Sequence, residues 1–338
     1  MKSPARPTSA ETKLLICVQN PVPMWNPPPD IGRRIHARFP EMHVVHLPDY
    51  DRFDRELSDT NILIAYSLAP AQLAKAPRLQ WIQSVSTGVN QFLYPELREN
   101  GVLLTNARSV HSVPMAQHIV GTMLALARQI PECFRYQQQS KWAQKELCSA
   151  SVPPRELLGQ VLLFIGFGAI GRDTANLLRP FGVRVWAVTR LGHADPDLAE
   201  KVFPSSRLHE ALAEADFVVI AAPDTPETRQ MIGTRELARM KPSAYLINVA
   251  RGSIVDEAAL IAALQRHAIA GAALDVTATE PLPPESPLWK LDNAFITPHV
   301  SAATDRVWER QENLIVENLQ RWFTGRELLN RVDLEHGY

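Results

Sequence analysis

Three ionisable residues each follow a short apolar segment in the second half of the sequence. Arg251 comes after LINVA, Glu280 after GAALDVTAT, and His299 after AFITP. In an open parallel sheet, ligands bind beyond the carboxyl ends of the strands, so we expect the three side chains to face one crevice. Singly, each has a structural explanation: a hydrogen-bonded histidine, a loop carboxylate and an ion-pair arginine. Their coincidence beyond a nucleotide-binding turn favours a catalytic centre.

The expected nucleotide-binding turn is FIGFGAIGRD, which continues the apolar run VLLFI and opens a helix. A glycine motif alone is a weak signal, because glycine turns also make ordinary strand–helix connections. In this context, Gly166 would allow the tight turn, Gly168 the approach of a pyrophosphate, and Gly171 close packing of helix on strand. The free N–H groups of Ala169 and Ile170 would face the phosphates.

The end of the next apolar run, VRVWAVT, bears on which dinucleotide is bound. An Asp or Glu there would bond the ribose hydroxyls and repel a 2′-phosphate. The sequence instead has Thr189 and Arg190, whose hydroxyl and guanidinium donate to phosphate. We therefore expect NADP (NADPH) as the cofactor, with NAD bound at lower affinity. The alternative is that Arg190 is a solvated surface charge and the ribose is held otherwise.

The elements that must position these residues form two series of apolar strands alternating with helix-like segments. The first series has candidate strands within 13–20, 43–47, 61–67, 79–88 and 101–107, and helix-like segments at 28–39 and 70–77. The second has candidate strands within 161–166, 183–189, 216–223, 244–251, 271–276 and 294–300, and helices at 206–215, 256–268 and 306–323. We predict an α/β protein with two Rossmann/flavodoxin-like doubly wound parallel-sheet domains and a cleft between them.

Between the two series, the stretch from Val113 keeps apolar residues at helical spacing. It has few helix breakers before Pro131, and it predicts one long helix followed by an arm from Ile130 to about Ala150. Residues 1–112 with 300–338 are predicted to form the substrate-binding (catalytic) domain. Residues 113–299 are predicted to form the NAD(P)-binding Rossmann domain.

The composition limits the possible partners and compartment. A net charge of −1 over 338 residues gives no electrostatic case for nucleic acid or an anionic membrane. The start MKSPARPTSAETK lacks the apolar core of a signal peptide, and no apolar run is long enough to span a bilayer. Cys17, Cys133 and Cys148 are odd in number and far apart, which favours reduced thiols in a cytoplasmic protein. No CxxC or HExxH pattern indicates a metal site.

Six stretches together resemble one known family. They are QSVSTGVNQF, GFGAIG, DFVVIAAPDTPETRQMI, LINVARGSIVDEAAL, ALDVTATEPLP and ITPHVSAAT, and they span the chain from about Trp81 to the final helix. The chain resembles the D-isomer-specific 2-hydroxyacid dehydrogenase family, on the glyoxylate/hydroxypyruvate reductase side. The combination is far more specific than any single motif.

The resemblance implies NADPH-dependent reduction of small 2-oxoacids to D-2-hydroxyacids by hydride transfer. Arg251 would bind the substrate carboxylate and polarise its keto oxygen. His299 would donate a proton to that oxygen, and Glu280 would orient the ring and favour the imidazolium. Thr87 and Gly88 resemble the family's substrate loop, whose backbone N–H groups hold the carboxylate. The alternative for this loop is a tight glycine turn without a ligand.

The resemblance also implies the remaining cofactor contacts. These are Ala222 and Pro223 at the adenosine half, Val249 and Ala250 beside the nicotinamide, and Asp275 at the nicotinamide amide or ribose, with Arg251, His299 and Ala302 completing the set. Departures from the family pattern are Ala302 where Gly is common, Gln117 where an acid is usual, and Asn90 where Asp is usual. None removes a catalytic group, and they bear on substrate preference.

Two other functions stay open. A phosphoglycerate dehydrogenase-like enzyme would share the catalytic residues, but many such enzymes carry a regulatory domain, and this chain stops shortly after a helix ending near Gly325. A dinucleotide-sensing, corepressor-like binding protein would use the same fold, although an intact Arg–Glu–His set favours turnover. Formate dehydrogenase is disfavoured, because there the histidine pairs with a glutamine. The arm from Ile130 to Ala150, with Trp142, is the expected contact of a homodimer.

Overall fold

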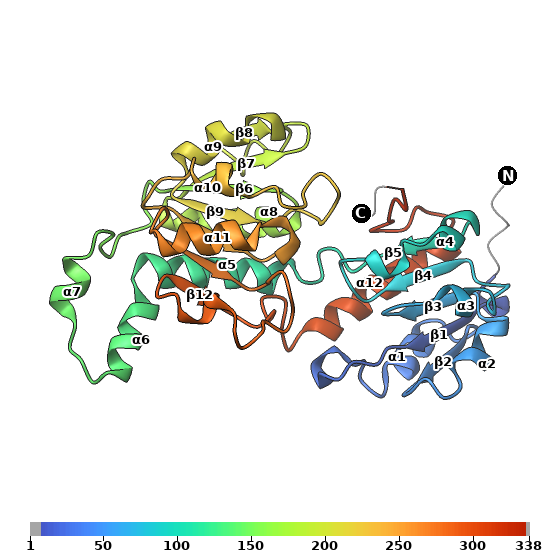
Figure 1. The fold of residues 1–338 in the computed structure, drawn as a ribbon. Helices are drawn as coiled ribbons and strands as arrows, with labels where there is room; N and C mark the ends of the chain where they lie inside the picture. Colours follow the sequence, from blue (N-terminus) through green and yellow to red (C-terminus); the bar gives the residue numbers. More distant parts are fainter. Residues whose placement is uncertain (1–7, 336–338) are drawn as a thin grey trace. The chain divides into compact units, whose positions relative to one another are not determined.

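The computed structural model describes residues 8–335. The first seven residues, at the start where we expect no signal peptide, and residues 336–338 lie outside the described residues. The chain divides into two compact units, residues 1–111 with 303–338 and residues 112–302. Each unit is built on its own parallel sheet (Figure 1), so the predicted α/β class with two doubly wound parallel sheets is confirmed.

The first unit contains a sheet of five parallel strands in the order β2-β1-β3-β4-β5. The strands are β1 (Lys13–Cys17), β2 (His43–Leu47), β3 (Ile62–Ala65), β4 (Trp81–Ser84) and β5 (Leu103–Thr105). All five lie within segments that the apolar runs predict. The buried, near-continuous apolar character of β1 and β3 is what a parallel sheet covered on both faces requires.

Helices from both ends of the chain cover the faces of this sheet. One face packs against α1 (Ile31–Arg38) and the predicted C-terminal helix α12 (Val307–Phe323). The other face packs against α2 (Phe53–Glu56), α3 (Pro70–Leu73) and α4 (Pro95–Glu99). The buried ring of Trp81 on β4 stacks on Trp322 of α12 at 5.7 Å between centroids, so the C-terminal segment completes the core of the first unit.

The second unit contains a sheet of seven parallel strands in the order β12-β11-β10-β9-β6-β7-β8. The strands are β6 (Val161–Ile165), β7 (Arg184–Thr189), β8 (Lys201–Pro204), β9 (Phe217–Ile220), β10 (Tyr245–Asn248), β11 (Gly271–Leu274) and β12 (Ala294–Ile296). Strand order reverses at β6, which makes the sheet doubly wound in the manner of a dinucleotide-binding fold.

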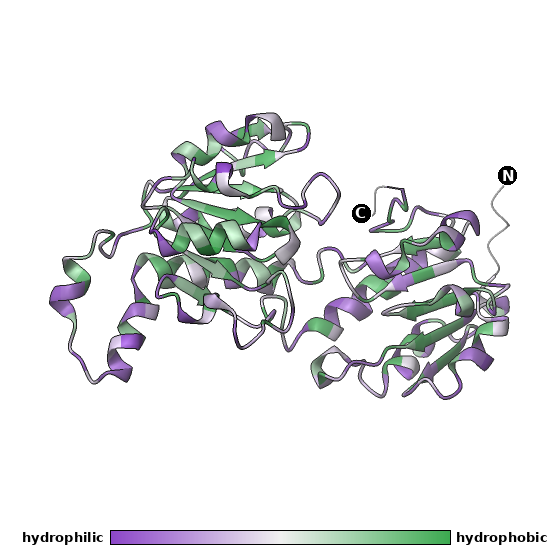
Figure 2. Cartoon of the chain, viewed as in Figure 1, coloured by the Kyte–Doolittle hydropathy of each residue, from purple (hydrophilic) through white to green (hydrophobic). Residues whose placement is uncertain are grey.

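Five helices cover the two faces of the second sheet. Residues of α5 (Ser112–Ala127) and α8 (Ala169–Leu178) bury one face. Residues of α9 (Leu208–Glu214), α10 (Thr234–Leu237) and α11 (Glu257–Gln265) bury the other. In Figure 2, hydrophobic residues concentrate on the strands of both units and hydrophilic residues on the outer helices and loops.

The sequence analysis did not predict β8. Its four residues, KVFP, follow a polar loop and end in proline, so they carry no strand pattern of their own. The strand forms because Trp186 to Thr189 of β7 offer a parallel partner at the sheet edge.

The predicted long helix and the arm that follows it from Ile130 are present, with a break between them. Helix α5 ends at Ala127, Gln129 takes a left-handed backbone with φ 54°, and α6 (Ile130–Gln138) starts anew with Pro131 in its first turn. Proline fits the first turn of a helix but disfavours helical geometry in the residue before it. The break therefore falls just ahead of Pro131.

The predicted arm consists of α6 and α7 (Gln144–Cys148), which stand apart from the body of their unit in Figure 1. The chain returns beside the end of α5, where Arg155 N donates to Ala127 O at 2.8 Å. The three cysteines are free, and Cys133 and Cys148 are exposed on the arm. Within residues 8–335, no helix combines the length and apolar character needed to cross a membrane.

Candidate active site

The carboxyl ends of five strands of the second sheet lie in a single row. The strand residues that pair along this row are Ile165, Ile220, Asn248, Leu274 and Ile296. The loop that follows each strand therefore begins at the same edge of the sheet. The glycine turn and the loops that carry Arg251, Glu280 and His299 all start from this edge, as the strand-end argument predicts.

The structure brings His299 and Glu280 into direct contact. His299 Nδ1 lies 2.6 Å from Glu280 Oε2. The other carboxylate oxygen, Oε1, accepts a hydrogen bond from Thr277 N at 3.1 Å, which fixes the carboxylate within its loop. With Nδ1 engaged, Nε2 is the ring nitrogen left to face a reactant, and it has no partner in residues 8–335.

His299 has a left-handed backbone with φ 53°, which non-glycine residues rarely adopt. Its N–H donates to Asp275 O at 2.9 Å and to Thr297 O at 3.0 Å. Such a conformation persists only where neighbouring contacts determine it, and it is frequent at functional sites. The backbone at His299 is thus set by the residue that follows β11.

Asp275 holds the segment around His299 with its side chain as well. Its Oδ1 accepts from Thr297 Oγ1 at 2.6 Å and from Val300 N at 2.9 Å, and its Oδ2 accepts from Ser301 N at 3.0 Å. The residue is 3% exposed. Burial by itself would raise the pKa of Asp275, but hydrogen bonds from Ser301, Thr297 and the backbone hold that pKa below its ordinary value.

These contacts give Asp275 a structural role that was not predicted from the sequence. The sequence analysis places it at the nicotinamide, and that contact stays a prediction. In the structure, its carboxylate organises residues 297–301. The sequence signal for this role is the Thr297 hydroxyl two residues before the histidine in ITPH.

The loop of Arg251 packs directly on the loop of Glu280. A Cβ atom on Gly252 would lie 2.0 Å from the carbonyl carbon of Thr277, so only glycine allows this approach. Glu257 Oε2 accepts from Ala278 N at 2.9 Å and fastens the same two loops together. Three strand-end loops are therefore mutually fixed at this edge.

The Arg251 side chain forms a hydrogen bond with the backbone. Its Nη1 donates to Ala250 O at 2.7 Å, and Asn248 holds the turn by accepting from Ala250 N and donating to Arg251 O. In the described part of the chain, Arg251 forms no ion pair with a carboxylate. Its remaining donors can therefore bind an anion.

The glycine turn leaves β6 and enters α8 as predicted. Gly166 has φ 85°, and a Cβ there would lie 2.7 Å from the Cα atom of Ala222, so the turn requires glycine. At Gly168 a Cβ would meet no atom within 4 Å, which leaves open space at the start of α8. Ala169 and Ile170 begin this helix, whose first N–H groups lack intrahelical acceptors. Gly171 faces the ring of Phe167 in the same turn rather than the strand.

The end of β7 differs in one respect from the prediction. Thr189 Oγ1 accepts from His193 N at 3.0 Å and donates to His193 O at 3.2 Å, so the hydroxyl closes its own loop. It is not free to donate to a phosphate, because its one proton is used. Arg190 is exposed beside it, and β7 ends without a carboxylate.

The other predicted cofactor residues lie at the same edge. Ala222 and Pro223 follow β9, and Pro223 O accepts from Thr228 Oγ1 at 2.6 Å. The side chains of Val249 and Ala250 are buried and pack into the cores on the two faces of the sheet. Ala302 is the last residue of the second unit and is half-buried.

Thr87 and Gly88 belong to the first unit, in the loop after β4. Asn106 Nδ2 donates to Thr87 O at 2.9 Å, and Thr87 Oγ1 donates to Ala107 O at 3.4 Å. These bonds order the loop and leave the Thr87 side chain exposed. The substrate contacts of this loop stay predictions.

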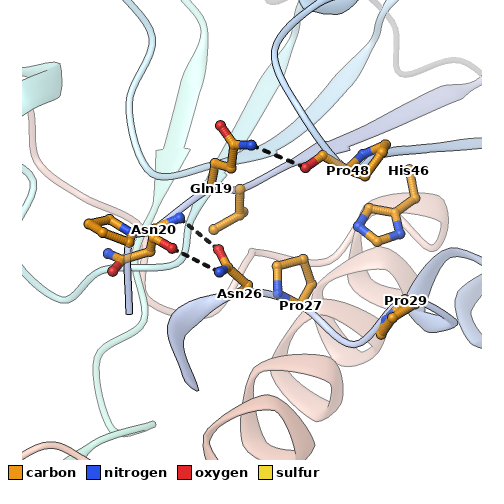
Figure 3. A pocket seen from close by; sticks show the side chains of 9 residues that line it. Gln19, Asn20, Asn26, Pro27, Pro29, His46 and Pro48 are labelled. Carbon is orange, nitrogen blue, oxygen red and sulfur yellow. Dashed lines mark hydrogen bonds between the residues drawn. The ribbon is translucent and has the colours of Figure 1, made fainter. Parts of the chain in front are cut away.

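The first unit also has a cavity of about 510 Å³ at the carboxyl ends of β1 and β2 (Figure 3). Proline rings and His46 line it, and Asn20 and Asn26 bond to each other across its rim at 2.6 and 2.8 Å. These bonds fix the loop beside the strand ends. Within residues 8–335, no cluster of His, Cys, Asp and Glu is suited to hold a metal ion.

Comparison with known proteins supports one family. The model of the D-isomer specific 2-hydroxyacid dehydrogenase NAD binding domain matches residues 120–301. A glyoxylate reductase from Pyrococcus furiosus is 36% identical over 251 residues, which cover 72% of this chain and 73% of that protein. A D-3-phosphoglycerate dehydrogenase from Methanocaldococcus jannaschii is 31% identical over 288 residues, 82% of this chain but 53% of that protein.

A solved structure resembles the fold over nearly its whole length. It is a D-isomer specific 2-hydroxyacid dehydrogenase from Xanthobacter autotrophicus in complex with NADPH and MES. It matches with a TM-score of 0.81 and 30% identity, covering 97% of this chain and all of that one (100%).

Replacing Asp275 by Asn tests how the His299 segment is held. The lowered pKa of Asp275 means that its carboxylate stabilises the fold above the unfolded pKa of about 3.9 and that this stability is lost as pH falls through the lower folded pKa. We expect Asp275→Asn to reduce the free energy of unfolding at pH 7 by about 2 kcal/mol, because hydrogen bonds to a charged acceptor are lost.

Denaturant unfolding of the two proteins from pH 7 to pH 3 measures this difference, which should narrow below about pH 3.9. Asp292→Asn, at an exposed carboxylate, is the control and should stay close to the parent protein. A difference for Asp275→Asn that does not change with pH would show that the charge is unimportant.

Proposed function

Because this chain belongs to the D-isomer specific 2-hydroxyacid dehydrogenase family, we propose that it reduces small 2-oxoacids of the glyoxylate or hydroxypyruvate type to D-2-hydroxyacids with NADPH. The observation that carries the proposal is the His299–Glu280 pair, 2.6 Å apart, at a sheet edge shared with Arg251 and the glycine turn. This set is suited to proton transfer beside a bound dinucleotide.

His299 is the proposed proton donor to the keto oxygen. Its Nδ1 is engaged by Glu280, so Nε2 carries the transferable proton. Glu280 keeps the ring in one orientation, and its own position is set by Thr277 N. In the oxidative direction the same nitrogen accepts the proton from the hydroxyl.

Arg251 is the proposed anchor for the substrate carboxylate. A guanidinium offers two parallel N–H donors that match a carboxylate, and a planar donor beside the keto oxygen also polarises it. Nη1 bonds to Ala250 O, which leaves the other donors of the fork for the substrate. Thr87 and Gly88 are proposed to add backbone N–H contacts from the first unit, the proposed substrate-binding (catalytic) domain.

The second unit is proposed to bind NADPH. The residues that fit this cofactor are the open turn at Gly168, the free N–H groups of Ala169 and Ile170, and the exposed guanidinium of Arg190. When bound, the nicotinamide supplies the hydride that the keto carbon accepts. Thr189 acts in this proposal by shaping the loop that presents Arg190, since its hydroxyl bonds to His193.

The remaining cofactor contacts stay as the resemblance implies them. They are proposed for Ala222, Pro223, Val249, Ala250, Asp275 and Ala302. The buried Val249 and Ala250 can offer only a small apolar surface, and the Asp275 carboxylate can offer only the acceptor capacity that its three hydrogen bonds leave. NAD is expected to bind more weakly than NADP, because Arg190 would lack its phosphate partner.

A phosphoglycerate dehydrogenase-like activity is the second candidate, favoured by the match to the Methanocaldococcus jannaschii enzyme. The chain spans about half the length of that protein. Both activities use the same acid–base pair, so a substrate panel distinguishes them. A corepressor-like sensor would bind NADPH but turn over none of these substrates.

We propose that the protein acts as a homodimer in the cytoplasm. The arm presents Ile130, Phe134 and Trp142 to solvent, and Trp142 is 91% exposed, which favours a protein partner. A second copy of the chain is the proposed partner. The free cysteines suit a reducing compartment. We propose no nucleic-acid or membrane partner, in keeping with a net charge of −1.

His299→Ala tests the proposed proton donor. We expect NADPH binding to be unchanged and the rate of glyoxylate reduction to fall by roughly two to four powers of ten, the usual contribution of a general acid. Stopped-flow NADPH oxidation and fluorescence titration measure the two quantities. His209→Ala is the matched control, since His209 Nε2 also lies 2.7 Å from a glutamate, Glu236, and neither residue belongs to the proposed site. Full activity in His299→Ala would place the acid elsewhere.

Thr189→Asp combined with Arg190→Ala tests cofactor choice. The introduced carboxylate can still accept a hydrogen bond from His193 N, so the loop should keep its conformation. The same carboxylate would repel a 2′-phosphate. We expect the NADPH-to-NADH ratio of kcat/KM to fall by about tenfold or more, the scale of a lost charged hydrogen bond. Arg266→Ala, at another exposed arginine of the unit, should not change the ratio. An unchanged ratio in the double variant would contradict phosphate recognition at Arg190.

Phe134→Asp tests the arm as a dimer contact. A charge on this exposed apolar side chain should convert the dimer to monomers at micromolar concentration, because burying an unpaired carboxylate is costly. Multi-angle light scattering gives the mass. Leu177→Asp, at an exposed apolar position on α8, should remain dimeric. A monomeric parent protein would refute the proposed dimer.

A further inference from the structure

Polar contacts, rather than core packing, hold the segment that carries His299. Strand β12 is a three-residue edge strand whose residues are only half-buried, and Val300 is 43% exposed. Residues 294–296 of β12 pack against the cores on the two faces of the sheet, whereas residues 297–301 do not belong to these cores. The side chain of Asp275, bonded to Thr297, Val300 and Ser301, supplies the restraint.

Thr297 is the side-chain member of this restraint. Its hydroxyl gives its only proton to Asp275 Oδ1 at 2.6 Å, and Thr297 N donates to Leu274 O at 3.0 Å. Thr297 is thus fastened to β11 through both backbone and side chain. His299 follows two residues later, so a shift of Thr297 would be transmitted to the histidine.

A second histidine approaches Thr297 from another element. His118 of α5 has its Nε2 3.4 Å from Thr297 Oγ1, although 179 positions separate the two residues along the chain. Because the Thr297 proton is committed to Asp275, its oxygen can only accept, so Nε2 of His118 must carry the hydrogen. Burial lowers the pKa of His118 although Asp275 opposes the effect, which favours the neutral ring with a single N–H.

We propose that Thr297 and His118 are positioning residues for the reaction: the chain His118 Nε2–H, Thr297 Oγ1–H and Asp275 Oδ1 sets where His299 presents Nε2 to the substrate. Neither residue contacts the reacting atoms. The kinetic part of this inference rests on the proposed reductase function, whereas the positioning itself is a property of the protein alone. Under this proposal, α5, which covers one face of the sheet, helps to hold His299 in position.

Paired variants separate the effect of losing a hydrogen bond from the effect of changing side-chain size. Thr297→Val keeps the side-chain shape and removes the hydroxyl, while Thr297→Ser keeps the hydroxyl. His118→Leu removes the donor, while His118→Gln keeps an N–H group at similar reach. Thr60→Val is the control for Thr297→Val, because Thr60 is a buried threonine of the first unit whose hydroxyl donates to Glu56 O at 2.6 Å.

We expect Thr297→Val to lower kcat by about tenfold, less than the roughly hundredfold cost of misplacing a catalytic group by about 1 Å. The dissociation constant for NADPH should stay unchanged, and the solvent deuterium isotope effect on kcat should increase as proton transfer becomes slower. Thr297→Ser should restore the parent rate. His118→Leu should lower kcat by a smaller factor, with recovery in His118→Gln, and the Thr297→Val/His118→Leu pair should be less than additive.

A measurement without cofactor or substrate keeps the inference independent of the activity. In 15N-histidine spectra of the free protein, the Nδ1–H resonance of His299 is assigned by its loss in His299→Asn. Thr297→Val should shift or broaden this resonance, and Thr60→Val should not. If the parent protein lacks reductase activity but the resonance responds, the proposed function fails and the positioning stands.

Three results would overturn the inference. One is an unchanged His299 resonance in Thr297→Val. Another is a loss of kcat in Thr297→Val that Thr297→Ser shares. The third is a loss of kcat matched by equal loss of NADPH affinity and of thermal stability, which would show a general structural defect.

Discussion

The candidate site depends on one constraint, which is that neighbouring parallel strands of the second sheet end side by side. Ile165, Ile220, Asn248, Leu274 and Ile296 form one row, so the loops that follow them start together although they are far apart in sequence. In a strand, a shift in register by one residue turns every side chain to the opposite face. Such a shift in β11 would move Asp275 off the edge and break its bonds to the His299 segment. The buried apolar residues on both faces of the sheet fix the register and, through it, the chemistry.

In the loops that follow these strand ends, close backbone contacts and hydrogen bonds, rather than hydrophobic packing, hold the chain in place. The left-handed backbone of His299 costs roughly 1–2 kcal/mol. The bifurcated bond from its own N–H and the bonds from Val300 N and Ser301 N to Asp275 each contribute about 0.5–1.5 kcal/mol, so together they are of the size needed to offset this strain. At the neighbouring loop, the approach of Gly252 to Thr277 excludes any side chain at that position. The proposed acid and the neighbouring loops are held by a few directional hydrogen bonds from backbone groups and from the side chains of Asp275, Thr297 and Glu257.

The sequence predicted the features that depend on local pattern. Short apolar runs located all five strands of the first sheet and six of the seven in the second, and the glycine spacing located the turn between β6 and α8. Strand β8 was not predicted because its pairing with β7, rather than a pattern in its own four residues, makes it a strand. The bonding of Thr189 to His193 was not predicted because it depends on a specific backbone geometry. The organising role of Asp275 was not predicted because its hydrogen-bond partners lie 22 to 26 positions away in the sequence.

The same sheet order separates cofactor choice from acid–base chemistry. Strand β7, which ends in Thr189, lies on one side of β6, whereas β10, β11 and β12, which precede Arg251, Glu280 and His299, lie on the other. Strands β9 and β6 lie between the end of β7 and the loops that follow β10, β11 and β12, so we expect residues at the end of β7 to change with little effect on the hydrogen bonds among those loops. The proposed nucleotide contact at Arg190 is therefore separate, within the sheet, from the proposed acid–base pair. The proposed substrate contacts of Thr87 and Gly88 are separated further, because these residues belong to a different folding unit with its own core.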